Sequence, residues 1–201
     1  MFTGIIEAQG QLRSSQALGD DLRMWIDTPA GFLEQASLGD SIAVNGVCLT
    51  VNEMQDGAFA ADLSRETLQL TTAGGWQTGQ ALNLEAALTL AKPLGGHLVS
   101  GHVDGIGHLR ASAPDARSLR LEFEAPAELA RYIARKGSIT IDGVSLTVNS
   151  VDGSRFGVNI VPHTLTHTSL GGLQSDDPVN LEVDLLARYL ERLISSTEKP
   201  A

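Results

Sequence analysis

The chain has 201 residues, and its 24 Asp and Glu side chains against 14 Lys and Arg give a formal charge of −10. Nucleic acids and anionic membranes repel such a charge, which argues against either as a partner. The single cysteine cannot form an internal disulfide, and we find neither a signal peptide nor an apolar run near the roughly 18 residues of a membrane span. We therefore expect a cytoplasmic protein.

Almost the same eight residues occur twice, as NGVCLTVN at 45–52 and DGVSLTVN at 142–149. The offset of 97 positions (142 − 45) also pairs Gly4 with Gly101, and Asn83-Leu84-Glu85 with Asn180-Leu181-Glu182, without a gap. A period of this length indicates two copies of one domain, because solenoid repeats run about 20 to 50 residues. We expect one domain over residues 1–97, a second over 98–184, and a tail over 185–201.

Short β-branched runs predict the strands of each copy. In the first copy they lie near residues 5–13, 22–27, 41–44, 47–51, 58–63 and 81–86, and each recurs 97 positions later. Asn45-Gly46 and Asp142-Gly143 separate neighbouring runs, and such dipeptides are strong hairpin signals. Six short strands with close turns predict a mainly β fold of two similar six-stranded antiparallel barrels in tandem.

Helices are expected at three places. Pro29 and Pro126 suit the first turn of short helices over 29–35 and 126–134, because proline lacks the N–H that would be unpaired there. Residues 89–96, with Pro93 and two glycines, predict the linker between the copies. Apolar residues of the tail recur at spacings of three and four, which predicts an amphipathic helix; they are Leu185, Leu186, Tyr189, Leu190, Leu193 and Ile194. This helix either packs on its own barrel or pairs with the same helix of other subunits.

Small polar side chains in the repeated strands are the first candidates for chemistry. Residues two apart in a strand face the same way, so Cys48 lies beside Thr50, and Ser145 beside Thr147. Each pair would place two polar or polarisable groups at one binding surface, and two such surfaces could bind two copies of one small molecule. Alternatively, the repeat preserves only hairpin and core positions, and Cys48 is a small buried apolar residue.

Histidines are concentrated in the second copy and the segment before it. His102 lies in the glycine-lined stretch SGHVDG, where an imidazole can approach a ligand and titrate near neutrality, whereas its counterpart in the first copy is Ile5. His163 and His167 have a spacing that would suit a metal on a helix, but Pro162 and the neighbouring threonines favour a loop. We predict no metal and no cofactor, since no phosphate-binding motif is present either. A hydrolase built from Ser145, His102 and Asp142 stays open, although no nucleophile elbow surrounds the serine.

The most particular motifs occur in order along the chain: MFTGI, NGVCLTV, GGHLVSGHVDG, KGSITIDGVSLTVN, NIVPHTL and DLLARYLERL. In these motifs the sequence resembles the α-chain type of riboflavin synthase over essentially its whole length. It departs from the family at Ser64, where a methionine is more frequent, and at Ala86, where an arginine is common. These departures concern the details of the first binding site.

The resemblance implies a transferase (EC 2.5.1.9) that needs no cofactor. Two molecules of 6,7-dimethyl-8-ribityllumazine would react by transfer of a four-carbon unit, giving riboflavin and 5-amino-6-(ribitylamino)uracil. The family fold is a pair of six-stranded Greek-key barrels followed by a C-terminal helix. Those helices would hold a homotrimer, with each working site between the first barrel of one subunit and the second barrel of a neighbour. Association with lumazine synthase is a further partner interaction that the resemblance suggests.

The resemblance also carries residues over to two substrate seats. The first seat would use Gly4, Ile5, Ile6, Cys48, Leu49, Thr50, Asp62, Leu63, Ser64, Arg65, Glu66 and Thr67. The second would use Gly101, His102, Val103, Lys136, Ser145, Leu146, Thr147, Asn159, Ile160, Val161, Pro162, His163 and Thr164. His102 is the leading acid–base candidate, with Ser145, Thr147, Cys48 and Asp142 as further catalytic candidates. The competing hypothesis is a non-catalytic lumazine- or flavin-binding protein of the antenna type.

Overall fold

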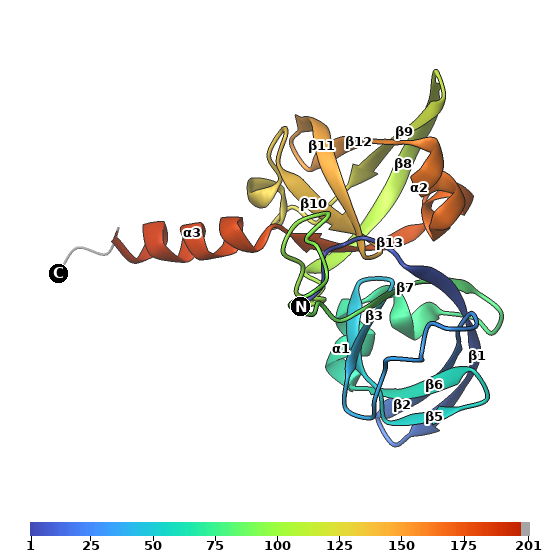
Figure 1. Ribbon diagram of the computed structural model, residues 1–201. Helices are drawn as coiled ribbons and strands as arrows, with labels where there is room; N and C mark the ends of the chain where they lie inside the picture. The colour runs from blue at the N-terminus through green and yellow to red at the C-terminus, as the bar shows by residue number, and fades with distance from the viewer. Residues whose placement is uncertain (198–201) are drawn as a thin grey trace.

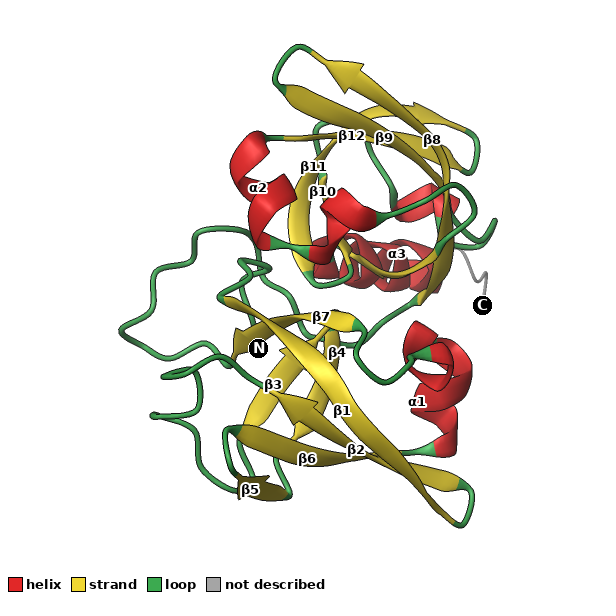
Figure 2. Cartoon of the chain, turned by 90° about the vertical axis from the view of Figure 1, so that its right-hand side faces the viewer, coloured by secondary structure: helices red, strands yellow, loops and turns green. Residues whose placement is uncertain are grey.

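The computed structural model describes residues 1–197. Two β modules lie one above the other, and a C-terminal helix leaves the second module and projects away from the body (Figure 1). The N-terminus lies between the modules, beside the loop that links them (Figure 2). The prediction of a mainly β protein with two similar β modules and a terminal helix is confirmed; the second module is a closed six-stranded barrel, whereas the strands of the first form a seven-stranded sheet that curves as a half-barrel.

The second module is a closed antiparallel barrel in the order β10-β11-β12-β9-β8-β13. Its strands are β8 (Gly105–Asp115), β9 (Ser118–Glu124), β10 (Ser138–Ile141), β11 (Val144–Asp152), β12 (Arg155–Ile160) and β13 (Pro178–Val183). The chain crosses from β9 to β10 without pairing these two strands, which gives the Greek-key arrangement. The predicted six-stranded barrel is confirmed here.

The first module has the same strands 97 positions earlier, in the order β4-β3-β7-β1-β2-β6-β5. They are β1 (Ala8–Leu18), β2 (Asp21–Asp27), β3 (Ser41–Val44), β4 (Val47–Thr50), β5 (Glu53–Gln55), β6 (Ala58–Leu63) and β7 (Ala81–Ala86). Seven strands appear because β4 and β5 together correspond to the single strand β11. The interruption at Val51 and Asn52 is short, and their N–H groups still donate to Asp40 and Ala60 on the two sides.

Each barrel encloses its own apolar core. Phe59 fills the first barrel, while Phe123 and Phe156 stack in the second with ring centroids 5.8 Å apart. Inward side chains alternate with outward polar ones, as in the burial pattern of β9, because side chains in a strand point alternately to the two faces. The two cores are separate, so contact between the modules depends on loops and turns.

Short helices differ from the expectation. The expected helix over 29–35 is wrong: this segment forms turns in which Gly31, at a left-handed φ of 90°, prevents continuous helix. In the second copy the expected helix over 126–134 is reduced to the 3-10 turn η2 (Ala130–Tyr132). Two helices that were not expected, α1 (Arg65–Leu70) and α2 (Pro162–His167), follow β6 and β12, each with a 3-10 turn after it (η1, Thr72–Gly75; η3, Ser169–Gly172). Pro162 lies at the start of α2, where proline is favoured.

The modules meet at their repeated hairpin turns. A Cβ on Gly46 would lie 2.7 Å from the Gly143 nitrogen, so the two turns pack directly against each other. Asn83 Nδ2 donates to the Asp142 carbonyl, and Asn180 Nδ2 donates to the Asn45 carbonyl, both at 2.9 Å. These bonds are related by the same offset of 97, so the interface has approximate twofold symmetry.

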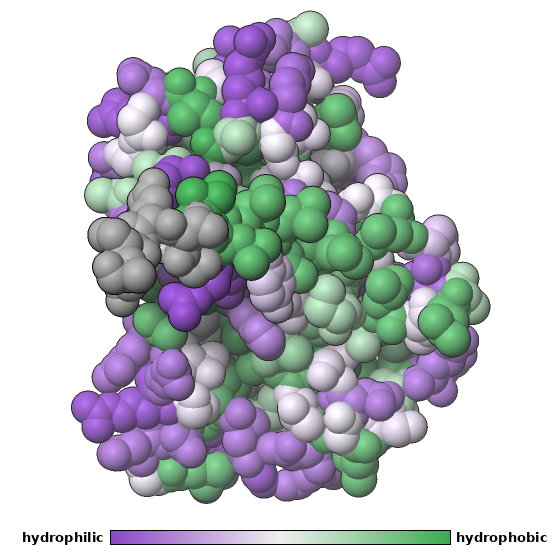
Figure 3. All heavy atoms as spheres, turned by 90° about the vertical axis from the view of Figure 1, so that its left-hand side faces the viewer, coloured by the Kyte–Doolittle hydropathy of each residue, from purple (hydrophilic) through white to green (hydrophobic). Residues whose placement is uncertain are grey.

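The tail helix α3 (Leu185–Thr197) exposes its apolar residues. Leu186, Tyr189, Leu190, Leu193 and Ile194 are 58% to 66% exposed. Figure 3 views the side towards which α3 points and shows apolar surface across the middle of the molecule. The helix therefore does not bury this face on its own barrel. Within residues 1–197, no helix is long and apolar enough to cross a membrane.

Candidate functional site

In strands β4 and β11 the small polar residues lie on the face away from the core, as the alternation of side chains along a strand predicts. Cys48 and Ser145 are half-buried and Thr50 and Thr147 are exposed, whereas the residues between them, Leu49 in β4 and Leu146 in β11, face the cores. We call the surface around Cys48 and Thr50 the first seat, and the surface around Ser145 and Thr147 the second seat. The ends of β6 and β12 lie beside them, because β4 contacts β6 and β11 pairs with β12.

The loops that close the seats cross between the modules. Gly4, at the start of the first copy, accepts a 2.7 Å hydrogen bond from the Ser145 N–H, and Gly101 accepts one of 2.8 Å from the Cys48 N–H. Ile6 packs on the core of the second barrel and Val103 on the core of the first. The expected allocation is therefore reversed: Gly4, Ile5 and Ile6 border the second seat. Likewise, Gly101, His102 and Val103 border the first seat.

Glycine is required at both crossings. Gly4 and Gly101 have left-handed φ angles of 73° and 77°, and a Cβ would lie 2.6 Å from Ser145 Cβ or 2.7 Å from Cys48 Cβ. Such a φ is rare for residues with a side chain, and the added contact would also be too short. Repetition of these glycines in the sequence thus reflects a close approach of the backbone to each seat.

Two buried carboxylates hold the crossing loops in place. Glu85 accepts hydrogen bonds from the N–H groups of Thr3 and Gly4 at 2.7 and 2.9 Å. Glu182 accepts the equivalent bonds from Ser100 and Gly101 at 2.6 and 2.9 Å. Burial raises the pKa of Glu182, while the bonds from Ser100 and Gly101 oppose the rise.

The first seat contains an ion-paired acid. Asp62, at the end of β6, accepts a 2.6 Å hydrogen bond from Arg23 Nε, and this bond lowers the pKa of the Asp62 carboxyl. Leu63 is buried, whereas Ser64 caps α1 by accepting from the Thr67 N–H at 3.2 Å. Arg65 and Glu66 form the exposed first turn of α1. His102 is exposed, and its backbone N–H donates to Ser100 Oγ.

The second seat differs in its polar groups. Asn159 replaces Asp62 at the equivalent position, and its buried Oδ1 has no hydrogen-bond partner among the described residues. Ile160 is buried, while Val161, Pro162, His163 and Thr164 turn the chain into α2. Lys136 is exposed at a left-handed φ of 69°, and its N–H donates to the Val148 carbonyl.

Asp142 lies at the interface between the modules. The Asn180 N–H donates to its Oδ1 at 2.8 Å, and complete burial raises the pKa of the Asp142 carboxyl to about 7. The structure thus pairs Asp142 with Asn180 and not with His102, which borders the other seat. The residues of the alternative hydrolase, Ser145, His102 and Asp142, are not brought together as a triad.

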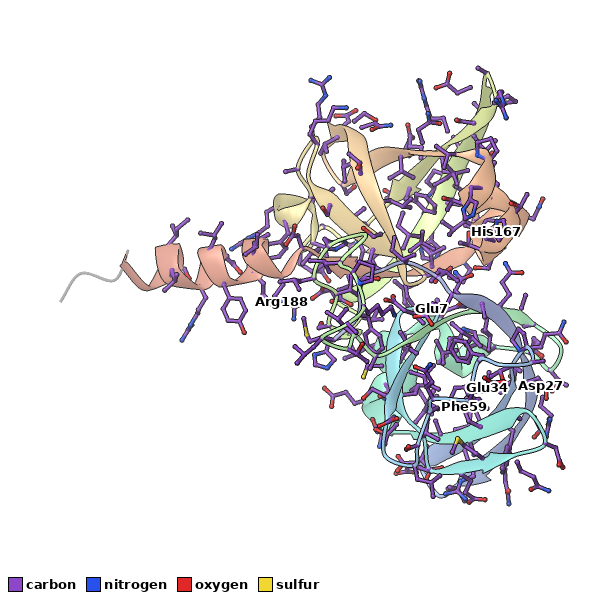
Figure 4. The ribbon with its side chains drawn as sticks, in the orientation of Figure 1. Glu7, Asp27, Glu34, Phe59, His167 and Arg188 are labelled. Atoms are coloured by element: carbon purple, nitrogen blue, oxygen red, sulfur yellow. The ribbon has the colours of Figure 1, made fainter. Side chains whose placement is uncertain are left out.

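His163 and His167 lie on α2, so the loop expected there is wrong. Their rings stack with centroids 4.1 Å apart. His167 lies on the outer side of this helix in Figure 4. No group of three or more His, Cys, Asp and Glu that could hold a metal occurs within residues 1–197.

His97 is a candidate that the sequence does not reveal. Its Nδ1 lies 2.7 Å from Ser145 Oγ, and its Nε2 lies 3.3 Å from Thr140 Oγ1. Burial lowers the pKa of this imidazole, and the negative charge of Asp184 opposes that shift. The repeat gives no signal for His97, because subtracting 97 leaves no equivalent residue in the first copy.

Two cavities within the described residues lie away from Cys48 and Ser145. One of about 580 Å³ lies between the modules and is lined by Asn45, Trp76, Asp142 and Leu173 among others. Another, of about 540 Å³, lies beside Phe32 and Lys92 in the first module. Neither of these two cavities is lined by Cys48 or Ser145.

Comparisons with known proteins agree with the duplication. The lumazine binding domain family matches residues 3–87 and again residues 100–184. Riboflavin synthase from Photobacterium phosphoreum is 43% identical over 194 residues, which is 96% of this chain and 89% of the relative. Riboflavin synthase from Mycobacterium tuberculosis (strain ATCC 25618 / H37Rv) is 45% identical over 200 residues, covering 98% and 99%.

Solved structures of LumP share this fold. LumP complexed with riboflavin superposes with a TM-score of 0.85 at 25% identity, covering 91% of this chain and 99% of that chain. LumP complexed with flavin mononucleotide has a TM-score of 0.82, also at 25% identity and with the same coverage.

Proposed function

The chain belongs to the riboflavin synthase family, and from this premise we propose that it converts two molecules of 6,7-dimethyl-8-ribityllumazine into riboflavin and 5-amino-6-(ribitylamino)uracil. The reaction transfers a four-carbon unit from one lumazine to the other, so the protein is a transferase, EC 2.5.1.9. The products together contain all the atoms of the two substrates. No oxidant or reductant is therefore needed.

Retention of both seats is the observation that carries this proposal. Each seat has a strand with a small polar pair, a closing loop fixed through a glycine, and a buried glutamate that holds that loop. A protein that only binds a chromophore needs one such seat. Two seats that are alike in backbone and different in side chains suit a reaction between two copies of one molecule that play different parts.

The seats supply positioning and acid–base groups. Holding two reactants in the correct orientation can remove about 7 to 11 kcal/mol from a barrier, and a placed acid or base adds a factor of about 10² to 10⁴. We assign Cys48, Thr50, His102 and the segment Asp62–Thr67 to the first lumazine. The second lumazine would be bound by Ser145, Thr147, Lys136 and the segments Gly4–Ile6 and Asn159–Thr164.

Individual catalytic roles are part of the proposal. His102 borders the first seat, where an exposed imidazole can exchange protons with a bound ring. Ser145, Thr147 and Cys48 would polarise or position the substrates. Asp142 would affect catalysis indirectly, by fixing the hairpin turn that precedes Ser145.

We further propose a cytoplasmic homotrimer held by α3. The apolar face of this helix is exposed in the single chain, and exposed apolar surface of this kind marks an interaction site. In the trimer, the first seat of one subunit would face the second seat of its neighbour. The proposed domains remain residues 1–97 and 98–184, with the oligomerisation segment over 185–201. Association with lumazine synthase stays a proposal from the family resemblance.

An assay with the substrate tests the function. Purified protein mixed with 6,7-dimethyl-8-ribityllumazine should produce riboflavin, followed by its absorbance, and calorimetry with a non-reacting analogue should find two sites per chain. The LumP likeness supports a second candidate, a binding protein without turnover. Tight binding of one lumazine per chain with no riboflavin formed would select that candidate and refute the enzyme.

A further inference from the structure

The two seats differ in what contacts the small polar side chain of their strand, which is Cys48 in β4 and Ser145 in β11. Ser145 Oγ lies 2.7 Å from His97 Nδ1, and His97 Nε2 lies 3.3 Å from Thr140 Oγ1. In the first seat, Cys48 and Ala43 stand where the second has Ser145 and Thr140, and no residue corresponds to His97. The chain of hydrogen bonds Thr140–His97–Ser145 therefore belongs to the second seat alone.

This histidine is held from two sides. Its backbone N–H donates to the Thr3 carbonyl at 3.1 Å, next to the Gly4 carbonyl that accepts from Ser145 N–H. Asp184, whose charge acts on the imidazole, accepts the Leu186 N–H at 3.0 Å at the start of α3. The ring is thus fixed between the N-terminal segment and the root of the tail helix.

The hydrogen bonds favour one arrangement of protons. Burial favours the neutral imidazole, which has one N–H donor and one acceptor nitrogen. If Nδ1 accepts from the Ser145 hydroxyl, Nε2–H donates to Thr140 Oγ1, and both contacts are satisfied. The lone pairs of Ser145 Oγ then remain available to the seat, and Asp184 is placed to stabilise a positive charge on the ring.

We propose that His97 is a positioning residue that acts through Ser145 and makes the second seat the one where the substrate loses a proton. This inference rests on the function proposed above. In the step, a C–H bond of a ring methyl breaks and Ser145 Oγ receives that proton. The serine's own proton passes to His97 Nδ1, and the electron pair stays delocalised over the electron-poor ring. The first seat, with Cys48 and no histidine behind it, binds the other lumazine.

A double-mutant cycle tests the coupling. Wild type, His97→Gln, Ser145→Ala and the double variant are compared in riboflavin formation and in deuterium exchange of the lumazine methyl protons by NMR. Each single change should lower both rates by about 100-fold or more, with KM changed little. The double variant should be no slower than the single ones, because both changes interrupt the same proton path. A His97→Gln rate within about threefold of wild type would overturn the proposal. So would a rate loss in the double variant equal to the product of the losses in the two single variants.

Control variants separate this role from general damage. His108→Gln copies Gln11 of the first module and should match wild type; an equal loss there would overturn the specific role of His97. If His97→Gln does not fold, Thr140→Ala, which copies Ala43, tests the same hydrogen-bond chain. A lower rate at unchanged KM supports the proposal, and an unchanged rate overturns it. Wild type that forms no riboflavin would instead refute the proposed function itself, and this inference with it.

Discussion

Asp142 is the residue at which two matched turns differ in charge. Its counterpart Asn45 accepts the Asn83 N–H at 2.7 Å, just as Asp142 accepts the Asn180 N–H at 2.8 Å. Burial of Asp142 raises the pKa of its carboxyl from 3.8 to about 7. The folded protein therefore binds a proton that the unfolded chain has released between these pH values.

This difference predicts a pH effect on stability. The stabilising contribution of the protonated carboxyl is fully present below about pH 4 and is lost as pH rises through about 7, with a ceiling of about 4 kcal/mol. Asp142→Asn should remove this slope and be more stable than wild type at pH 8, since the amide keeps the acceptor. Chemical denaturation at several pH values, followed by tryptophan fluorescence, measures the difference. Equal slopes in the two proteins would contradict the buried titration.

Gly101 offers a test of the crossing loops at the same scale. Gly101→Ala adds a methyl group 2.7 Å from Cys48 Cβ, so lumazine binding at the first seat should weaken at least tenfold. Gly57 is the matched control, since its φ of 73° is similarly left-handed but nothing lies within 4 Å of its added Cβ. Gly57→Ala should cost about 1 kcal/mol of stability and leave binding unchanged. Equal binding losses in the two variants would show that the close approach is not what matters.

Among the elements, α3 is the one that projects from the body of the molecule (Figure 1), and contacts near its start attach it to the second module. Arg188 binds Asp104 at its root at 2.5 Å, and Glu191 pairs with Arg131 and Tyr132. Figure 4 shows Arg188 where the helix leaves the barrel. These contacts fix the first turns of α3 to the second module, while the apolar face of the same helix is exposed.

Truncation of α3 tests its role in assembly. A chain that ends after Asp184 keeps β13, with buried Val183, and the charge that acts on His97. We expect it to fold, to sediment as a monomer and to lose at least 99% of its turnover, because the two seats would no longer face each other. Sedimentation and the riboflavin assay measure both results. An active monomer would refute a site between subunits.

On the scale of the whole molecule, the modules are joined by paired asparagines. Asn83 Oδ1 accepts a hydrogen bond from the Ser169 N–H, and Asn83 Nδ2 donates one to the Asp142 carbonyl. In the same way, Asn180 Oδ1 accepts from the Thr72 N–H, and Asn180 Nδ2 donates to the Asn45 carbonyl. Both side chains are buried, so these bonds are costly to break. They fix the hairpin turns and the 3-10 turns η1 and η3 of the two modules against each other.

Loss of this connection should uncouple the modules. Asn83→Ala leaves the buried Asp142 carbonyl without this partner, at a cost of about 1 to 3 kcal/mol, and also leaves the part-buried Ser169 N–H unpaired at a smaller cost. Calorimetry should then show two unfolding transitions, or one broader transition, where we expect a single sharp one for wild type. The exposed asparagine Asn52→Ala serves as the control and should leave the profile unchanged. A single sharp transition in Asn83→Ala would mean that the cores, not these bonds, set the cooperativity.

The sequence by itself determined the duplication, the strands, the hairpin turns and the amphipathic tail. These features are local: alternation, Asn-Gly and Asp-Gly pairs, and three-to-four spacing express the preferences of neighbouring residues. The pairs Cys48 with Thr50 and Ser145 with Thr147 followed from the same period of two. Among the local elements the short helices were misjudged, because a left-handed glycine within 29–35 and a favourable proline at 162 outweighed the composition of those segments.

Only the tertiary structure decided which loop borders which seat. The crossing of Gly4 to Ser145 and of Gly101 to Cys48 depends on how two modules pack about a twofold axis, and no local preference records that packing. The same holds for His97, which lies 48 positions from Ser145 in the chain and next to it in space, and for the burial of Asp142. Contacts between residues far apart in sequence are set by the packing of whole barrels, which is why they had to be seen in three dimensions.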